Sequence, residues 1–121
     1  MQNKKTLVLG ASTNPERVSG EAVQRLLRAG HQVVAVGIRE GEIYGTPIFT
    51  GTPEVEDVHT VTLYLNPDRQ KEYYPYILSL RPQRIIFNPG TENHELARIA
   101  KEAGIESEFA CTLVMLSLKV Y

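Results

Sequence analysis

The chain has 121 residues, of which 42% are hydrophobic and 22% are charged, the composition of an ordinary globular domain. Its formal net charge is −1, so it lacks the basic excess that proteins need to bind nucleic acid or anionic membranes. A single cysteine excludes an intrachain disulfide, and no apolar run approaches the roughly 20 residues of a membrane span. With no secretory leader in view, we expect one cytoplasmic domain over residues 1–121, with neither nucleic acid nor membrane as partner.

Short apolar runs and helical patterns alternate from the first residues onward. Residues 6–9 predict a strand, and the apolar spacing over 22–27 predicts a helix that Gly30 ends. The β-branched run 32–36 predicts a second strand. The stretch 37–59 has two prolines, four glycines and no clear period. We expect a crossover there that is mostly loop, with one turn of helix over 53–58.

The second half of the chain continues the alternation. Residues 61–65 predict a third strand, and the spacing over 73–80 predicts a helix in which Pro75 causes a bend or a break. Further strands are predicted at 85–87 and 105–109, and further helices at 96–103 and 112–118. Alternating strands and helices with short connections predict an α/β domain with an open, mostly parallel sheet of five strands.

Ligands of such sheets bind at the carboxyl ends of the strands, where small and polar residues follow the first predicted strand. A glycine at a strand end, followed by a helix N-terminus, leaves backbone N–H groups that favour an anion. Hydroxyls and an arginine add donors. The loop fits neither a dinucleotide fingerprint nor a phosphate-binding P-loop, which disfavours ATP or GTP hydrolysis. The predicted binding residues of this loop are Gly10, Ala11, Ser12, Thr13, Arg17 and Ser19.

Three further loops follow strands at the same edge, beginning with Gly37-Ile38-Arg39. Arg39 suits a ribose that carries a phosphate, either the 2′-phosphate of NADP or the 3′-phosphate of coenzyme A, because guanidinium pairs with phosphate bidentately. It also fits a solvated surface arginine beside Glu40 and Glu42. The acid that usually holds the ribose of NAD is absent. The other two loops are Asn66-Pro67 and Asn88-Pro89-Gly90, which equally fit simple strand ends.

The sequence resembles the small single-domain CoA-binding proteins, which share their fold with the CoA-binding domain of the succinyl-CoA synthetase alpha subunit. The resemblance rests on the order and spacing of several segments, with a cysteine just past the fifth strand. Three positions depart from the family pattern: Gly37-Ile38 replaces Asn-Pro, His59 replaces Asp, and the acid of Asp-x-Cys is displaced to Glu108. The matching segments are Gly10-Ala11-Ser12 with Arg17 and Ser19, Gly30-x-x-Val33-x-x-Val36, Glu42-Ile43-Tyr44-Gly45, Gly90 and Glu102-Ala103-Gly104-Ile105.

The resemblance implies a Rossmann-like three-layer domain that holds CoA along the carboxyl edge of its sheet. It implies a diphosphate on the loop from Gly10 to Ser19 and a 3′-phosphate near Arg39. The pantetheine arm would pass Asn66-Pro67 and Asn88-Pro89-Gly90. We therefore predict binding of CoA or an acyl-CoA without catalysis. The alternatives are an NADP- or NAD-binding redox enzyme or regulator, and a partner that completes an acyl-CoA ligase in trans; a homodimer is compatible with each.

Other reactive side chains show no catalytic arrangement. The three histidines are scattered without metal-ligand spacing, and there is neither a nucleophile elbow nor a pair of carboxylates placed for acid–base work. Cys111 is predicted either as a small buried hydrophobe or as a thiol that forms a mixed disulfide with CoA. A tyrosine cluster, Tyr73, Tyr74 and Tyr76, fits a partly buried helix face, an adenine cover or a dimer surface.

Overall fold

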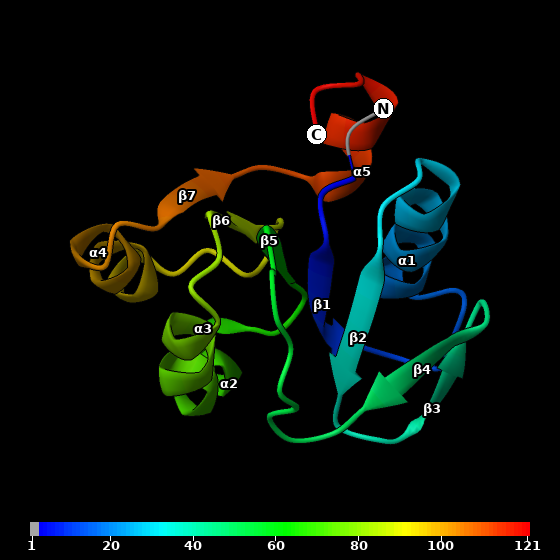
Figure 1. The fold of residues 1–121 in the computed structure, drawn as a ribbon, viewed down its shortest axis with the longest axis horizontal. Helices are drawn as coiled ribbons and strands as arrows, with labels where there is room; N and C mark the ends of the chain where they lie inside the picture. Colours follow the sequence, from blue (N-terminus) through cyan, green and yellow to red (C-terminus); the bar gives the residue numbers. More distant parts are fainter. Residues whose placement is uncertain (1–2) are drawn as a thin grey trace.

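A twisted sheet forms the centre of the molecule in the computed structural model, which describes residues 3–121 (Figure 1). The order of its strands is β3-β4-β2-β1-β5-β6-β7, and every neighbouring pair is parallel except β3 and β4. The described strands are β1 (Thr6–Ala11), β2 (Val33–Gly37), β3 (Gly41–Ile43), β4 (Thr46–Phe49), β5 (Thr60–Leu63), β6 (Arg84–Phe87) and β7 (Glu106–Phe109).

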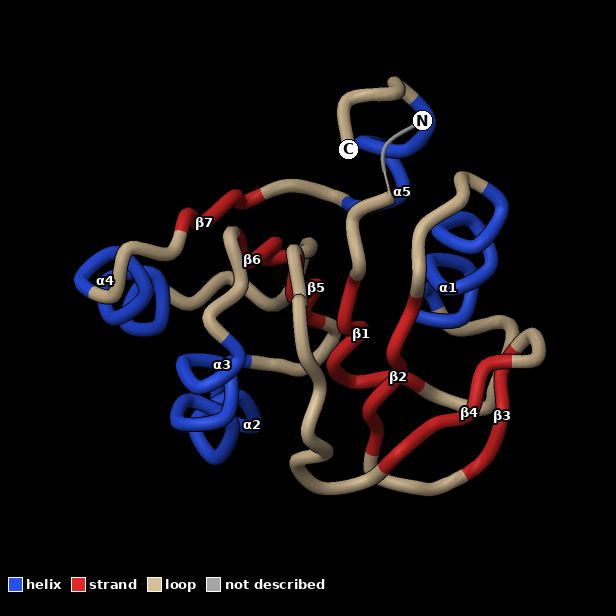
Figure 2. Tube along the Cα trace, in the orientation of Figure 1, coloured by secondary structure: helices blue, strands red, loops and turns tan. Residues whose placement is uncertain are grey.

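The central strands are buried on both faces, as parallel strands between two helical layers must be. All four residues of β5 and of β6 are buried. Helices α1 (Val18–Arg28) and α5 (Thr112–Ser117) pack together near one face of the sheet. The other layer (Figure 2) contains α2 (Pro67–Gln70), the 3-10 helix η1 (Lys71–Tyr73), α3 (Tyr74–Leu80) and α4 (His94–Glu102). The predicted Rossmann-like α/β class is therefore confirmed.

The predicted number of strands is wrong, because the described chain forms seven rather than five. The two additional strands, β3 and β4, make an antiparallel hairpin in the segment that was expected to be a loop. Tyr44 and Gly45 form its two-residue turn, with φ of 49° and 76°, the positive values that tight hairpin turns require. The strands are short and Pro47 interrupts the apolar pattern, so no strand period is visible in the sequence.

The turn of helix predicted over residues 53–58 is also wrong. This segment has no regular secondary structure and runs beside α3, where the Tyr76 hydroxyl donates a hydrogen bond to the Pro53 carbonyl at 2.6 Å. Asp57 has a positive φ of 59°, which a right-handed helix does not allow. Val58 is buried in the core. Contacts with a distant helix therefore determine the path of this loop.

The predicted break at Pro75 is present. The helical segment divides into α2, η1 and α3, and Pro75 lies in the first turn of α3, where its missing N–H costs no helical hydrogen bond. The tyrosine cluster agrees with the prediction of a partly buried helix face. Tyr73 and Tyr76 are buried in the core, and the hydroxyl of Tyr74 donates a hydrogen bond to Glu95 at 3.0 Å.

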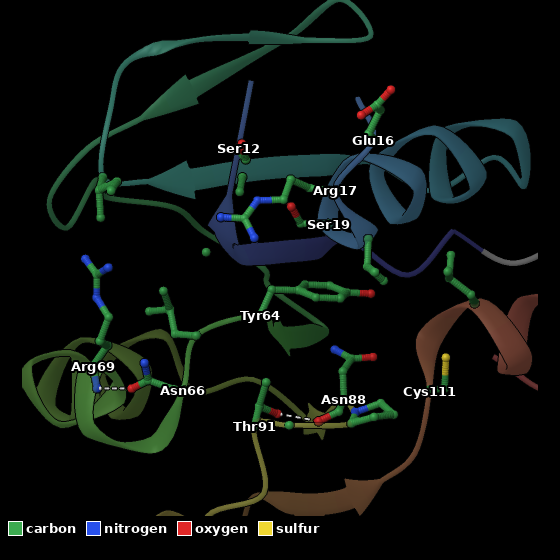
Figure 3. A pocket seen from close by; sticks show the side chains of 18 of the residues that line it. Ser12, Glu16, Arg17, Ser19, Tyr64, Asn66, Arg69, Asn88, Thr91 and Cys111 are labelled. Atoms are coloured by element: carbon green, nitrogen blue, oxygen red, sulfur yellow. Dashed lines mark hydrogen bonds between the residues drawn. The ribbon is translucent and has the colours of Figure 1, made fainter. Parts of the chain in front are cut away.

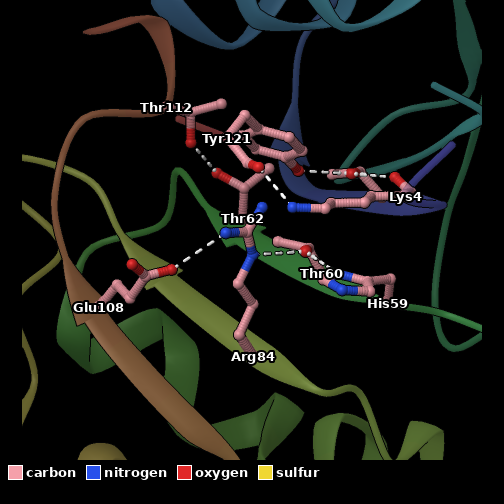
Figure 4. Close-up of polar contacts among 9 residues, drawn as sticks. Lys4, His59, Thr60, Thr62, Arg84, Glu108, Thr112 and Tyr121 are labelled. Carbon is pink, nitrogen blue, oxygen red and sulfur yellow. Dashed lines mark hydrogen bonds and ion pairs between the residues drawn. The ribbon is translucent and has the colours of Figure 1, made fainter. Parts of the chain in front are cut away.

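A buried polar cluster lies near the amino ends of the central strands (Figure 4). The Arg84 side chain is 9% exposed; it donates from Nε to Thr60 Oγ1 at 2.8 Å and pairs with Glu108 at 3.1 Å. The Tyr121 ring covers its guanidinium at 4.3 Å, and the Tyr121 hydroxyl hydrogen-bonds to Thr6. This cluster joins the end of the chain to the sheet.

Among residues 3–121, no helix is long and apolar enough to cross a membrane.

Candidate functional site

The loops that follow β1, β2, β5 and β6 meet at the carboxyl edge of the sheet and enclose a cleft of about 1040 Å³ (Figure 3). Since parallel strands end at the same edge, residues far apart in sequence come together here. Pro67 does not line the cleft; it is the first residue of α2 and begins that helix. The predicted residues that do line the cleft are Gly10, Ala11, Ser12, Thr13, Arg17, Ser19, Arg39, Asn66, Asn88, Pro89 and Gly90.

The β1–α1 loop packs closely against the end of β5 because Gly10 has no side chain. Its φ is 101°, and a Cβ there would lie 2.8 Å from the backbone carbon of Tyr64. The loop then turns through two local hydrogen bonds. Ser12 Oγ accepts from the N–H of Asn14 at 3.1 Å, and Asn14 Oδ1 accepts from the N–H of Glu16 at 2.9 Å. These local bonds define the turns of the loop that precedes α1.

The N-terminus of α1 has no side-chain cap. Its N-cap residue is Arg17, which makes no capping hydrogen bond. By contrast, Asn66 accepts from the N–H of Arg69 at 3.0 Å and caps α2, and Asn93 accepts from the N–H of Leu96 at 3.1 Å and caps α4. The N–H groups of Gly20 and Glu21 donate to the Arg17 carbonyl at 3.0 and 3.2 Å, which leaves those of Val18 and Ser19 for an external acceptor. The helix dipole favours a negatively charged one.

Three guanidinium groups line the cleft, those of Arg17, Arg39 and Arg69, against one carboxylate, that of Glu16. None of the three takes part in the ion pairs found within residues 3–121, which belong to Arg25, Arg84 and Arg98. In a chain whose net charge is −1, this edge therefore concentrates unpaired positive charge. A ligand with several negative charges fits it.

The two predicted asparagines use their side chains within the protein. Asn88 is buried; its Nδ2 donates to Thr62 Oγ1 at 2.7 Å and to the Leu63 carbonyl at 2.8 Å. Its Oδ1 accepts from the N–H of Thr112 at 2.9 Å. Asn88 thus joins β5, β6 and the start of α5, and Asn66 caps α2. Both shape the cleft. The amide of Asn88 is paired at both its nitrogen and its oxygen, whereas Asn66 uses its Oδ1 for the cap.

Cys111 and Tyr64 form part of the cleft wall beside Asn88 (Figure 3). Cys111 is half-buried, so the interpretation of it as a core hydrophobe does not describe its position. The mixed disulfide with CoA stays a prediction, which intact-mass analysis after treatment with oxidised CoA would test. Burial raises the pKa of Tyr64, whose hydroxyl has no hydrogen-bond partner among the described residues.

Sequence reasoning missed part of the cleft lining. Arg69 was detectable, because it follows the predicted Asn66-Pro67 loop within one helical turn. Tyr64 and Leu113 carried no such signal, since each lies in an apolar run that the core equally explains. The lining residues that were not predicted as binding residues are Glu16, Val18, Ile38, Tyr64, Leu65, Arg69, Thr91, Cys111 and Leu113.

The fold and the cleft define a Rossmann-like domain with an arginine-lined cleft at its carboxyl edge, and comparison with known proteins specifies its family. The chain belongs to a family of CoA binding domains, whose model matches residues 4–117. A comparison with curated proteins found no match.

Solved structures share this fold over nearly the whole chain. The crystal structure of an uncharacterized protein is 50% identical, with complete coverage of both chains and a TM-score of 0.97. A hypothetical protein from Pyrococcus horikoshii OT3 is 24% identical over 98% of this chain and 84% of its own, with a TM-score of 0.86. A dinucleotide-forming acetyl-coenzyme A synthetase 1 from Ca. Korarchaeum cryptofilum is 17% identical over 87% of this chain and 25% of its own, with a TM-score of 0.70.

Proposed function

We propose that this protein binds coenzyme A or an acyl-CoA in the cleft at the carboxyl edge of its sheet and performs no catalysis of its own. The observation that carries the proposal is the uncapped N-terminus of α1, which opens into a cleft lined by three unpaired arginines. Membership of a CoA binding domain family supports a CoA-related ligand. Free helix amides and guanidinium groups are both suited to phosphate.

The ligand's diphosphate lies on the β1–α1 loop in this proposal. The N-terminal amides of α1 and the hydroxyls of Ser12, Thr13 and Ser19 supply the donors. The pantetheine arm runs past Pro89 and Gly90 toward Cys111. An arm of this kind needs an elongated channel with few charges, and the wall formed by Tyr64, Leu113 and Pro89 supplies one.

Arg39 selects between related nucleotides. It follows β2 and lines the cleft, whereas Glu40 and Glu42 do not. The position therefore presents a cation where an NAD site needs a carboxylate for the ribose diol. This favours a phosphorylated ribose and disfavours NAD. NADP remains an alternative, because its 2′-phosphate would meet the same guanidinium.

The proposed absence of catalysis is supported by the lining residues. Among the side chains that line the cleft, Glu16, Tyr64 and Cys111 are titratable besides the arginines, and neither a histidine nor a second carboxylate lines it. Acid–base chemistry most often uses a histidine or a pair of carboxylates within reach of the reacting atoms. The amides, hydroxyls and arginines of the cleft suit binding.

Calorimetric titration with CoA, dephospho-CoA, NADP and NAD tests the proposal. We expect CoA to bind most tightly, and CoA at 100 times its Kd to raise the free energy of unfolding by about 2.7 kcal/mol. Arg39→Ala should weaken CoA binding by about 1.5–3 kcal/mol, the value of a charge-assisted hydrogen bond, and leave dephospho-CoA binding nearly unchanged. Arg28→Ala, at the far end of α1, is the control. Tighter binding of NADP or NAD than of CoA would contradict the proposal.

A further inference from the structure

The guanidinium of Arg69 reaches the cleft from α2, and the fold fixes the position of its backbone. The N–H of Arg69 donates to Oδ1 of Asn66 at 3.0 Å and approaches the Asn66 carbonyl at 3.1 Å. These bonds close the first turn of α2 behind its N-cap residue, Asn66. The exposed side chain lines the cleft and has no carboxylate partner within residues 3–121. Its charge is therefore available to a ligand.

The labelled side chains give the cleft two different ends. Figure 3 draws Arg69 toward one end and Cys111 toward the other, with the Arg17 guanidinium and Tyr64 between them. The Arg69 end is cationic. At the other end, Cys111 presents a thiol, and Leu113, two residues further along the chain, also lines the cleft. A ligand with phosphates at one end and a sulfur-bearing arm at the other fits this polarity in one direction.

The order of the strands places Arg39 and Arg69 on opposite sides of the β1–α1 loop. Strands β2 and β5 are the two neighbours of β1. Arg39 follows β2, and Arg69 follows β5. A phosphate bound beyond the β1–α1 loop would therefore lie between the two segments that carry these arginines. A phosphomonoester carries close to two negative charges at neutral pH, which two guanidinium groups match.

We propose that Arg69 is a specificity-determining residue that binds the ribose 3′-phosphate of the ligand together with Arg39. The N-terminus of α1 and Arg17 then bind the diphosphate. This inference rests on the proposed function and adds a second guanidinium for the 3′-phosphate, at the end of the cleft away from Cys111. In this proposal the two arginines together account for tighter binding of CoA than of dephospho-CoA.

Calorimetry on the full chain with CoA and dephospho-CoA tests the role of Arg69. We expect Arg69→Gln to weaken CoA binding at least tenfold and to change dephospho-CoA binding less than twofold. Lys71→Gln is the matched control, because this exposed lysine lies two residues away and does not line the cleft. Retained binding of dephospho-CoA also shows that the variant is folded.

A double variant tests whether the two arginines share one phosphate. Groups that bind the same phosphate are coupled, so Arg39→Gln combined with Arg69→Gln should weaken CoA binding less than the product of the two single losses. Three outcomes would overturn the inference about Arg69 but not the proposal that the protein binds CoA. They are losses of affinity that multiply in the double variant, an equal loss of affinity for CoA and dephospho-CoA in Arg69→Gln, and no loss of affinity in Arg69→Gln. Wild-type protein that binds neither ligand would overturn the proposed function as well.

Discussion

Gly10 shows how one residue positions the site. It lies near the end of β1, where the register with β2 shifts between Leu9 and Ala11. Its positive φ turns the chain toward α1, and its missing side chain lets the loop approach the backbone of Tyr64. The positive φ requires glycine because L-residues rarely adopt this conformation. The close approach to Tyr64 requires glycine because no side chain fits between the two segments.

We predict that Gly10→Ala destabilises the protein more than Gly45→Ala does. Both glycines have positive φ, which costs an L-residue about 1–2 kcal/mol, but a Cβ at Gly45 meets no atom within 4 Å. At Gly10 the clash with Tyr64 adds about 1–3 kcal/mol. Urea unfolding of both variants measures the difference. Equal losses would show that the close approach of the loop does not contribute.

The hydrogen bonds of Asn66 and Asn88 within the protein were not predicted from these residues alone. Both were predicted as binding residues because they follow strands at the expected edge. Both line the cleft, but one caps a helix and the other joins two strands to α5. A buried amide needs hydrogen-bond partners, and the partners of Asn88 are 25 or so residues away in the chain. Sequence alone does not identify them.

At the scale of elements, α1 differs from its neighbours by its open N-terminus. The asparagines that cap α2 and α4 stabilise their helices by about 1 kcal/mol each. Arg17, with φ of −73° and ψ of 147°, has the backbone conformation of an N-cap but makes no capping bond. The helix therefore lacks this stabilisation at the position where the proposed diphosphate binds.

We predict that Arg17→Asn stabilises the fold and weakens ligand binding. The new side chain caps α1 and should raise the free energy of unfolding by about 1 kcal/mol. It also occupies the amides and removes a charge, so CoA binding should weaken at least tenfold. Thermal unfolding and calorimetry measure the two effects.

Arg17→Gln is the control, because it removes the charge without supplying a good cap. Weaker CoA binding by Arg17→Asn than by Arg17→Gln would identify the amides as ligand donors. If the two variants bind CoA equally, the helix N-terminus does not contact the ligand.

At the scale of the whole molecule, the two edges of the sheet have different roles. The carboxyl edge carries the cleft, and the polar cluster around Arg84 ties the last residue to the sheet near the amino edge (Figure 4). Two histidines adjoin this cluster. His31 Nδ1 accepts from the N–H of Lys4 at 2.9 Å, and His59 Nδ1 lies 2.7 Å from Thr60 Oγ1. Burial, with Lys4 and Arg84 nearby, lowers the pKa of both histidines.

We predict that the protein loses stability as the pH falls below about 6.5, the pKa of an unperturbed histidine. In that range the two histidines bind more protons in the unfolded chain than in the folded protein. The free energy of unfolding therefore decreases as the pH falls. Above pH 7 both states are neutral at these residues, and the contribution is fully present. Urea unfolding between pH 5 and pH 8 measures the slope.

His31→Asn separates this effect from the titration of carboxylates. An asparagine oxygen can still accept from the N–H of Lys4 but does not titrate, so the slope below pH 6.5 should decrease. His94→Asn, on the exposed first turn of α4, is the control. An unchanged slope in His31→Asn would contradict the prediction. The homodimer with which the sequence is compatible also belongs to this scale, and light scattering during gel filtration would test it.

The sequence by itself determined the parallel α/β class and the edge of the sheet that carries the cleft. The apolar runs of β1, β5 and β6 and the spacing in α1 and α4 are local patterns, because burial of a strand or of one helix face imposes its period on neighbouring residues. Only the tertiary structure decided the β3–β4 hairpin, the buried hydrogen bonds of Asn88, and the place of Arg69 across the β1–α1 loop from Arg39. These depend on the order of strands and on contacts between distant segments, which leave no period in the sequence.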